Sequence, residues 1–289
     1  MRKLLLFIIL PLMFSCTSGV PAGNKEVITV SILPFKYFID KIGGDDFDVN
    51  VMVPPGADPH IYEPAPQQIT ALSRSVAYLS DGYLGFEMTW LDRFYEANTR
   101  MKKINLGKDI DLILATEDHG EHQEGADPHY WSTPRSAAVI AADVKNLLCS
   151  LKPAQKEKYE KNFSILADSI ASLDTLARKL FAGMEGSTFM IFHPALGYLA
   201  RDYHLNQLAV EREGKEPDPG YMKSLIDEAK GKHIKKIFIQ KGFDIKNASA
   251  IASETGAVIR ELDPLGEDWY ANMKDIIVAV HGSLIEGKR

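Results

Sequence analysis

Residues 154–181, AQKEKYEKNFSILADSIASLDTLARKLF, decide the architecture because they contain neither glycine nor proline. Apolar side chains recur every three or four positions along this stretch, at Tyr159, Phe163, Leu166, Ile170, Leu173, Leu176 and Leu180. This spacing predicts one amphipathic helix of about 28 residues, roughly 42 Å long. Pro153 fits its first turn and Gly183 its end. The helix is long enough to connect two halves of the chain.

Short runs rich in β-branched residues lie on both sides of this helix, four before it and four after it. They occupy residues 27–32, 48–53, 76–81, 102–106, 188–192, 206–210, 235–240 and 257–262. Roughly 10–20 residues of helical or loop pattern follow each run, which is typical of βα units with parallel strands. We therefore expect an α/β protein of two similar lobes joined by a stiff helix that permits little hinge closure. A helical hairpin within a single domain is the alternative.

The N-terminus has the pattern of an export signal. Arg2 and Lys3 precede an apolar run at residues 4–14 that is too short for a permanent membrane span, and Ser15 precedes Cys16. Cys16 stands where bacterial lipoproteins carry their lipidated cysteine, so we expect a lipid anchor there; a plain secretory signal is the alternative. The expected divisions are a signal peptide 1–15, a tether 16–26, a first lobe 27–152, a linking helix 153–183 and a second lobe 184–289.

Charge and cysteine content exclude some partners and some crosslinks. The chain has 33 basic and 39 acidic side chains, a formal charge of −6, and the loss of Arg2 and Lys3 with the signal peptide gives −8. An acidic chain of this kind does not favour nucleic acid as a partner. Cys149 is the one cysteine besides Cys16. With Cys16 lipidated, no internal disulfide can form.

The pentapeptide Gly-Ala-Asp-Pro-His occurs twice, at residues 56–60 and 125–129. Proline fixes its own φ angle and drives the preceding aspartate toward extended conformations. His60 and His129, which close the two copies, are therefore presented from stiffened loops. This repeated context makes both histidines candidate metal ligands.

Two further candidates follow expected strands in the second half. His193 follows the run 188–192 and Asp263 the run 257–262, and a proline comes next in both cases. Binding residues gather at the carboxyl ends of strands in parallel sheets. Three imidazoles and one carboxylate would give a four-coordinate site that suits Zn²⁺, whereas Mn²⁺ prefers more oxygen. Because imidazoles must be neutral to bind, the metal affinity should fall as the pH drops through about 6.5.

A family resemblance runs through nearly the whole mature chain. It is carried by SILPFKYFIDKIGGD (31–45), VPPGADPHIYEPAPQQITALSRSVAYLSDG (53–82), GFEMTW (85–90), DPHYWSTP (127–134), FHPALGYLARDYHL (192–205) and LDPLG (262–266). In this order the segments resemble the metal-specific solute-binding proteins of ABC transporters (cluster A-I), in particular the zinc-binding subunit of the high-affinity zinc importer.

The resemblance implies an α/β fold of two (βα)₄-like lobes with parallel sheets, joined by one long rigid backbone helix. It also implies that Zn²⁺ is bound in the interlobe cleft by His60, His129, His193 and Asp263. The implied partner is the transmembrane permease of an ABC importer. The chain would then be a lipid-anchored, periplasmic or extracytoplasmic monomer and not an enzyme.

Other functions stay open as alternatives: a relative that binds Mn²⁺ or Fe²⁺, a zinc hydrolase, and a surface adhesin or assembly factor. Manganese-binding relatives typically carry a carboxylate at the position of His193, and the H-E-x-x-H and G-x-S-x-G motifs of hydrolases are absent from the sequence. The acidic loop 117–127 holds only His119 and His122, where zinc-binding members often carry a long histidine-rich loop. We expect His119→Ala to change zinc affinity little. Glu87, in GFEMTW, is a candidate for orienting the metal ligands without binding the ion itself.

Overall fold

The computed structural model describes residues 25–114, 125–211, 217–243 and 245–287. The expected signal peptide, Cys16 and the loop histidines His119 and His122 lie outside the described residues. Among the helices in these ranges, none combines the length and the apolar character needed to cross a membrane.

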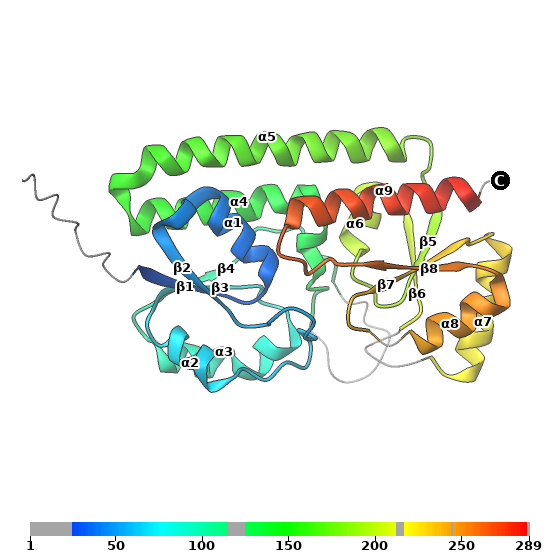
Figure 1. Cartoon of the computed structure of the whole chain (residues 1–289), viewed down its shortest axis with the longest axis horizontal. Coiled ribbons are helices and arrows are strands. Elements are labelled where there is room, and N and C mark those ends of the chain that lie inside the picture. The colour runs from blue at the N-terminus through cyan, green and yellow to red at the C-terminus, as the bar shows by residue number, and fades with distance from the viewer. Residues whose placement is uncertain (1–24, 115–124, 212–216, 244, 288–289) are drawn as a thin grey trace, which may run out of the picture.

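The first lobe is built on a four-stranded parallel sheet of order β2-β1-β3-β4. Helix α1 lies on one face of this sheet, and helices α2 and α3 lie on the other (Figure 1). Each strand of this sheet lies close to its expected run of β-branched residues. The bounds are β1 Glu26–Val30, α1 Leu33–Gly43, β2 Phe47–Val51, α2 Pro66–Leu72, β3 Ser75–Ser80, α3 Gly85–Ala97 and β4 Lys102–Asn105.

The second lobe repeats the same wiring, with a four-stranded parallel sheet of order β6-β5-β7-β8. Helices α7 and α8 cover the face that lies away from the long helix (Figure 1). The bounds are β5 Thr188–Ile191, α6 Gly197–Asp202, β6 Asn206–Ala209, α7 Pro219–Gly231, β7 Lys236–Gln240, α8 Lys246–Thr255, β8 Val258–Leu262 and α9 Trp269–Gly287. The expected α/β fold of two parallel-sheet lobes is confirmed.

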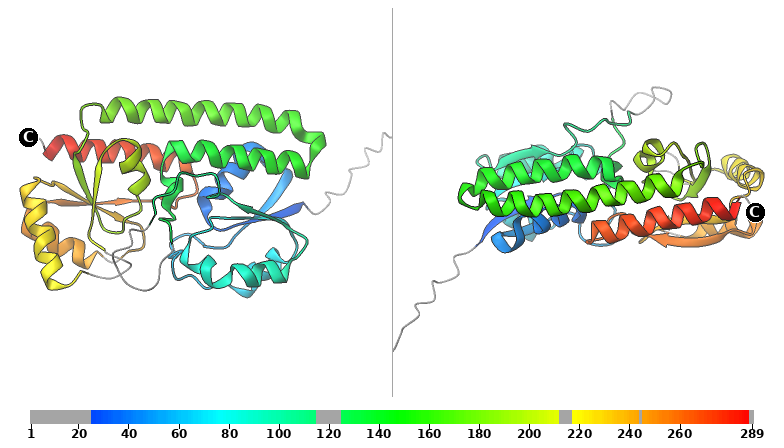
Figure 2. Two further views of the ribbon diagram at one scale, coloured as in Figure 1. Left: turned by 180° about the vertical axis from the view of Figure 1, so that it is seen from behind. Right: turned by 90° about the horizontal axis from the view of Figure 1, so that it is seen from above.

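The long helix is also confirmed. After α4 (Pro134–Leu151) and a 3₁₀ turn at Pro153–Gln155 (η3), helix α5 runs for 26 residues over Lys156–Phe181. It packs on α1 and α4 above the first sheet and on α9 above the second, and from above it extends over both lobes (Figure 2). Its apolar stripe is buried against these helices, at Tyr159, Leu166, Ile170, Leu173, Ala177 and Phe181.

The junction of the lobes is held by two tryptophans, each only 1% exposed. The indole N–H of Trp131 donates to the carbonyl of Pro264 at 3.0 Å, and that of Trp269 donates to the carbonyl of Trp131 at 2.8 Å. A single apolar core includes the first sheet, α5, α9 and the inner side of the second sheet. A smaller, separate core lies under α7 and α8. The two lobes are therefore joined by buried contacts as well as by α5.

All strands in each sheet are parallel, so the loops that follow the strands meet at one edge. A cavity of about 300 Å³ lies at this edge between the lobes. Its walls come from loops after β1, β2, β5, β7 and β8 and from the segment around His129. The fold thus places the strand ends of both lobes around one cavity.

Candidate metal centre

His60 is presented by the loop between β2 and α2. The Oδ1 atom of Asp58 accepts the backbone N–H of His60 at 2.8 Å, which closes a tight turn around Pro59. An aspartate side chain that accepts the amide two residues on is the usual way in which Asp stabilises such a turn. The imidazole of His60 lines the cavity and is half-buried.

The second copy of the pentapeptide forms the same turn around His129. The Oδ1 atom of Asp127 accepts the backbone N–H of His129 at 2.9 Å and contacts its Nδ1 at 2.7 Å. Asp127 therefore holds both the backbone and the ring of His129, which opens the 3₁₀ turn η2 (His129–Ser132). The repeated sequence gives a repeated local geometry because both turns depend on the same Asp-Pro-His order.

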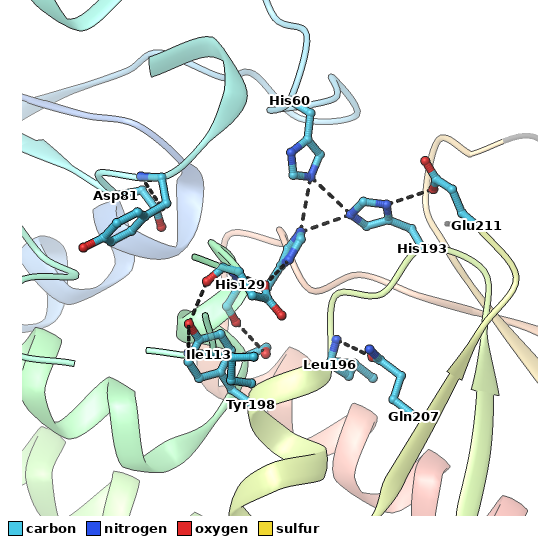
Figure 3. Close-up of polar contacts among 12 residues, drawn as sticks. His60, Asp81, Ile113, His129, His193, Leu196, Tyr198, Gln207 and Glu211 are labelled. Carbon is cyan, nitrogen blue, oxygen red and sulfur yellow. Dashed lines mark hydrogen bonds and ion pairs between the residues drawn. The ribbon is translucent and has the colours of Figure 1, made fainter. Parts of the chain in front are cut away.

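His193 follows β5 and is held by residues that are distant in the sequence. The side chain of Gln240, at the end of β7, donates to the carbonyl of His193 at 2.6 Å and accepts its N–H at 3.3 Å. The Nδ1 atom of His193 lies 2.9 Å from a carboxylate oxygen of Glu211, which follows β6 (Figure 3). Neighbouring strands of the second sheet thus orient both the backbone and the ring.

The three imidazoles converge on one point through their Nε2 atoms (Figure 3). The Nε2 separations are 3.3 Å between His60 and His129, 3.2 Å between His60 and His193, and 3.1 Å between His129 and His193. A tetrahedral Zn²⁺ ion with nitrogens at about 2.0–2.1 Å holds them about 3.3 Å apart. Since Asp127 and Glu211 accept hydrogen bonds from the Nδ1–H groups of His129 and His193, the Nε2 atoms of these two rings carry lone pairs that face one another. A cation at their centre would relieve this repulsion.

The protonation states also suit a metal. Burial, together with the neighbouring His129 and His193, lowers the pKa of His60 from 6.5 to about 3. Burial lowers the pKa of His129 as well, against the opposing effect of Asp127. For Asp127, burial would raise the pKa, but the hydrogen bond and charge of His129 outweigh it and the net shift is downward. His60 and His129 are therefore neutral at neutral pH, which is the form that binds a metal.

Asp263 lines the same cavity, directly after β8. Among the described residues, the group whose possible ligand atoms all lie within 4.8 Å of one another consists of His60, His129 and His193 alone. A carboxylate oxygen of Asp263 lies 4.0 Å from the ammonium of Lys241. The structure thus brings together three of the four residues selected from the sequence and places the fourth in the lining of the same cavity, outside this group.

Glu211 and Gln240 were not found by sequence reasoning. Both stand at or just after the carboxyl end of a strand, β6 and β7 respectively, which is the same signal that identified His193 and Asp263. Their relation to His193 depends on strand neighbours in the sheet, which the linear sequence does not give. Glu87 does not contact the three histidines; it is buried behind the loop of His60.

Comparison with known proteins places the chain in a family. The family described as "ZnuA: Zinc-uptake complex component A periplasmic" matches residues 28–280. The chain is 25% identical over 264 residues to the zinc-binding lipoprotein AdcA of Streptococcus pneumoniae, covering 87% of this chain and 52% of AdcA. It is 29% identical over 258 residues to the high-affinity zinc uptake system protein ZnuA of Bacillus subtilis, covering 84% of this chain and 79% of that protein. The chain spans about half the length of the AdcA relatives that it matches.

Solved structures agree with this match. A crystal structure of ZnuA superposes with a TM-score of 0.83 at 37% identity, covering 90% of this chain and 99% of that one. A ZnuA deletion mutant with zinc bound gives a TM-score of 0.82 at 37% identity, with 90% and 98% covered. The two-lobed fold and the family match over residues 28–280 lead to the same assignment. The chain belongs to the ZnuA family of periplasmic zinc-uptake complex components.

Proposed function

We propose that the protein is an extracytoplasmic receptor that captures Zn²⁺ and delivers it to the permease of an ABC importer. The observation that carries the proposal is the convergence of three Nε2 atoms at 3.1–3.3 Å. The family description, the zinc-binding relatives and the zinc-bound ZnuA structure support the same cargo. Zn²⁺ is the transported ligand here, and we assign the protein no enzymatic step.

Nitrogen donors favour Zn²⁺ over the alternatives Mn²⁺ and Fe²⁺. Imidazole is a good ligand for zinc, whereas manganese sites are richer in oxygen. A hydrolase would need a free general base beside the metal. Two carboxylates beside the histidines, Asp127 and Glu211, are engaged with the Nδ1 atoms of His129 and His193, and a third, Asp263, is assigned below to the ion itself. This engagement supports a receptor in preference to a zinc hydrolase.

We propose Asp263 as the fourth ligand. It shares the cavity with the three histidines, and its partner Lys241 is 62% exposed, so the pair is weak. A small movement of the loop after β8 toward the ion would exchange the contact with Lys241 for a metal bond. The buried hydrogen bond from the indole N–H of Trp131 to the carbonyl of Pro264 restricts this movement to the immediate surroundings of Asp263.

The assignment includes where the protein acts. We propose that the lipid on Cys16 anchors a monomer to the membrane, that the segment up to residue 26 is its tether, and that the metal cleft faces the permease. The AdcA of Streptococcus pneumoniae is named a lipoprotein, which supports the anchor. Nucleic acid is not a partner under this proposal, since the chain is acidic.

Metal competition tests the cargo, and crystallography at the zinc absorption edge tests the ligands. Metal-free protein incubated with equal Zn²⁺ and a large excess of Mn²⁺ should retain one Zn²⁺ per chain in elemental analysis. Anomalous scattering should then place the ion among the three histidines and Asp263. Retention of manganese, or an ion bound elsewhere, would refute the proposed function. An ion held by the histidines and a water would refute only the role of Asp263.

A further inference from the structure

A turn behind the metal centre connects β3 to α3 and contains a buried acid pair. Glu87 is fully buried, and its carboxylate accepts the backbone N–H groups of Asp81 at 2.9 Å and Gly82 at 2.5 Å, as well as the hydroxyl of Ser31. Asp81 is also fully buried; its Oδ1 accepts the N–H of Tyr83 at 3.1 Å. The side chain of Glu87 therefore closes the turn on itself.

The acid pair is costly to bury. Burial raises the pKa of Asp81 and of Glu87, and the charge of Glu87 raises that of Asp81 further. The Oδ2 atom of Asp81 has no hydrogen-bond partner among the described residues. Apolar side chains would fill such a place at lower cost in free energy. The free-energy cost of burying these two acids is therefore not explained by a contribution to stability.

The turn contacts the segment that carries His60. The N–H of Phe86 donates to the carbonyl of Pro59 at 3.2 Å. A Cβ atom added at Gly85 would lie 2.2 Å from the carbonyl oxygen of His60 and 3.0 Å from its carbonyl carbon. Contacts this short do not occur between a Cβ and backbone atoms, so any side chain at Gly85 would displace the backbone of His60.

The same turn contacts the segment that carries His129. The hydroxyl of Tyr130, which is fully buried, donates to the carbonyl of Asp81 at 3.0 Å. Tyr130 directly follows His129, so this bond fixes the chain next to the ligand. Asp81 lies on the first-lobe side of the three histidines (Figure 3). One turn thus meets the backbone of His60 and the side chain of Tyr130, the residue next to His129.

We propose that residues 81–87, which we name the support turn, set the position of His60 relative to His129, with Gly85, Glu87 and Tyr130 as positioning residues. The inference rests on the proposed function, since it concerns the same zinc site. The support turn acts from behind the ligands: Glu87 closes it, Gly85 lets the loop of His60 rest on it, and Tyr130 ties the turn of His129 to it.

Gly85→Ala is the sharpest test, and Gly282→Ala is its matched control because a Cβ added at Gly282, in α9, meets no atom within 4 Å. Two measurements on the full chain would be made: zinc affinity in competition with a chromogenic chelator, and the visible absorption of the Co²⁺-loaded protein. Gly85→Ala should weaken zinc binding by about tenfold or more and change the Co²⁺ spectrum, while Gly282→Ala changes neither. Wild-type affinity and spectrum in Gly85→Ala would overturn the inference.

Milder variants keep the test decisive where Gly85→Ala fails to fold. Tyr130→Phe keeps the ring and removes only the hydrogen bond to Asp81, so zinc binding should weaken while the thermal midpoint stays near the wild-type value. Glu87→Gln keeps one of the two acceptor oxygens of Glu87 and should restore part of the affinity that Glu87→Ala loses. Unaltered zinc binding in Tyr130→Phe and Glu87→Ala would refute the support turn. Failure of the wild-type chain to bind zinc would refute the proposed function instead.

Discussion

The two lobes have the same strand order, but their candidate ligands follow partly different strands. Each lobe carries one candidate after its fourth strand, His129 and Asp263, whereas the other candidate follows the second strand in the first lobe, His60, and the first strand in the second lobe, His193. The shared wiring brings strand ends of both lobes to the edge where the cleft lies. The local sequence determines which of the loops after the strands carries a candidate ligand.

The lobes also differ in how each histidine is oriented. In the first lobe, Asp58 and Asp127 hold histidines that lie only two residues away. In the second lobe, His193 is held by Glu211 and Gln240, which lie 18 and 47 residues away. Local turns can form before the fold is complete, but the second-lobe contacts need the finished sheet. Local turns therefore orient the first-lobe histidines, whereas the pairing of strands in the second sheet orients His193.

Removal of one histidine from each lobe should give the largest effect. His129→Ala and His193→Ala should each weaken zinc binding by more than about a hundredfold, beyond the range of changes that spare the direct ligands. Competition titration of both variants would measure this. His204→Asn is a suitable control, because His204 is exposed, lies outside the cavity, and has a positive φ angle that Asn tolerates. A strong loss of zinc affinity in only one of the two variants would show that the ion is bound without the other histidine.

The stability of the metal-free protein should fall in acid because of the first-lobe histidines. The pKa of His60 is about 3 in the fold and 6.5 in the unfolded chain, so below pH 6.5 the unfolded state binds a proton that the native state does not. Stability is unaffected above pH 6.5 and decreases as the pH falls toward 3, by about 2 kcal/mol at pH 5. At His60, the same burial moves the protonation that competes with metal binding below the pH of about 6.5 that a free imidazole would give.

Urea unfolding of metal-free protein at pH 7.5 and pH 5 measures this term, with His60→Asn as the comparison. The variant cannot take up the proton at this position in either state, so it should lose less stability between the two pH values. Equal losses in wild type and His60→Asn would contradict the shift assigned to His60.

Neutralising the carboxylates that orient the rings should give an intermediate effect and compares the lobes directly. Asp127→Asn and Glu211→Gln each keep an oxygen acceptor but remove the charge, and each should weaken zinc binding by about tenfold. Asp127→Ala should cost more than Glu211→Ala, because Asp127 also holds the backbone N–H of His129. The reverse order in calorimetric titrations would show that the second-lobe contact is the more important one.

The smallest effect is expected at the contact between Lys241 and Asp263. The two groups lie 4.0 Å apart and Lys241 is largely exposed, so the pair is weak. Lys241→Gln frees Asp263 to bind the ion, and should strengthen zinc binding by about twofold to threefold. The double variant with Asp263→Asn should abolish the gain. A gain that survives in the double variant would mean that Lys241 acts on the ion without Asp263.

Much of the fold could be predicted because its signals are periodic or local. The spacing of apolar residues between Tyr159 and Leu180 predicted α5, and the runs of β-branched residues predicted all eight strands within the described residues to within two residues. The repeated Asp-Pro-His order predicted stiff turns, and both turns form as hydrogen-bonded loops. These features depend on neighbours in the sequence.

The contacts that could not be predicted join residues distant in the chain. The contact of Glu211 with His193 requires β5 and β6 to be neighbours in the sheet. The hydrogen bond from Trp131 to Pro264 requires the two lobes to be packed together. Gly85 gave no sign of its role, because a glycine at a helix start is explained equally well without His60. Strand order and lobe packing decide these contacts, and neither has a local signature.

The position of Trp131 has a consequence for how the protein can be studied. Its indole is buried at the junction of the lobes, and its ring centre lies 5.3 Å from that of His129. Fluorescence of an indole responds to charge and to quenching by a nearby imidazole, so an ion bound by His129, as we propose, should alter the emission of Trp131. Trp131 would then be an intrinsic optical probe of metal loading, and uptake and release could be followed in real time without an added dye.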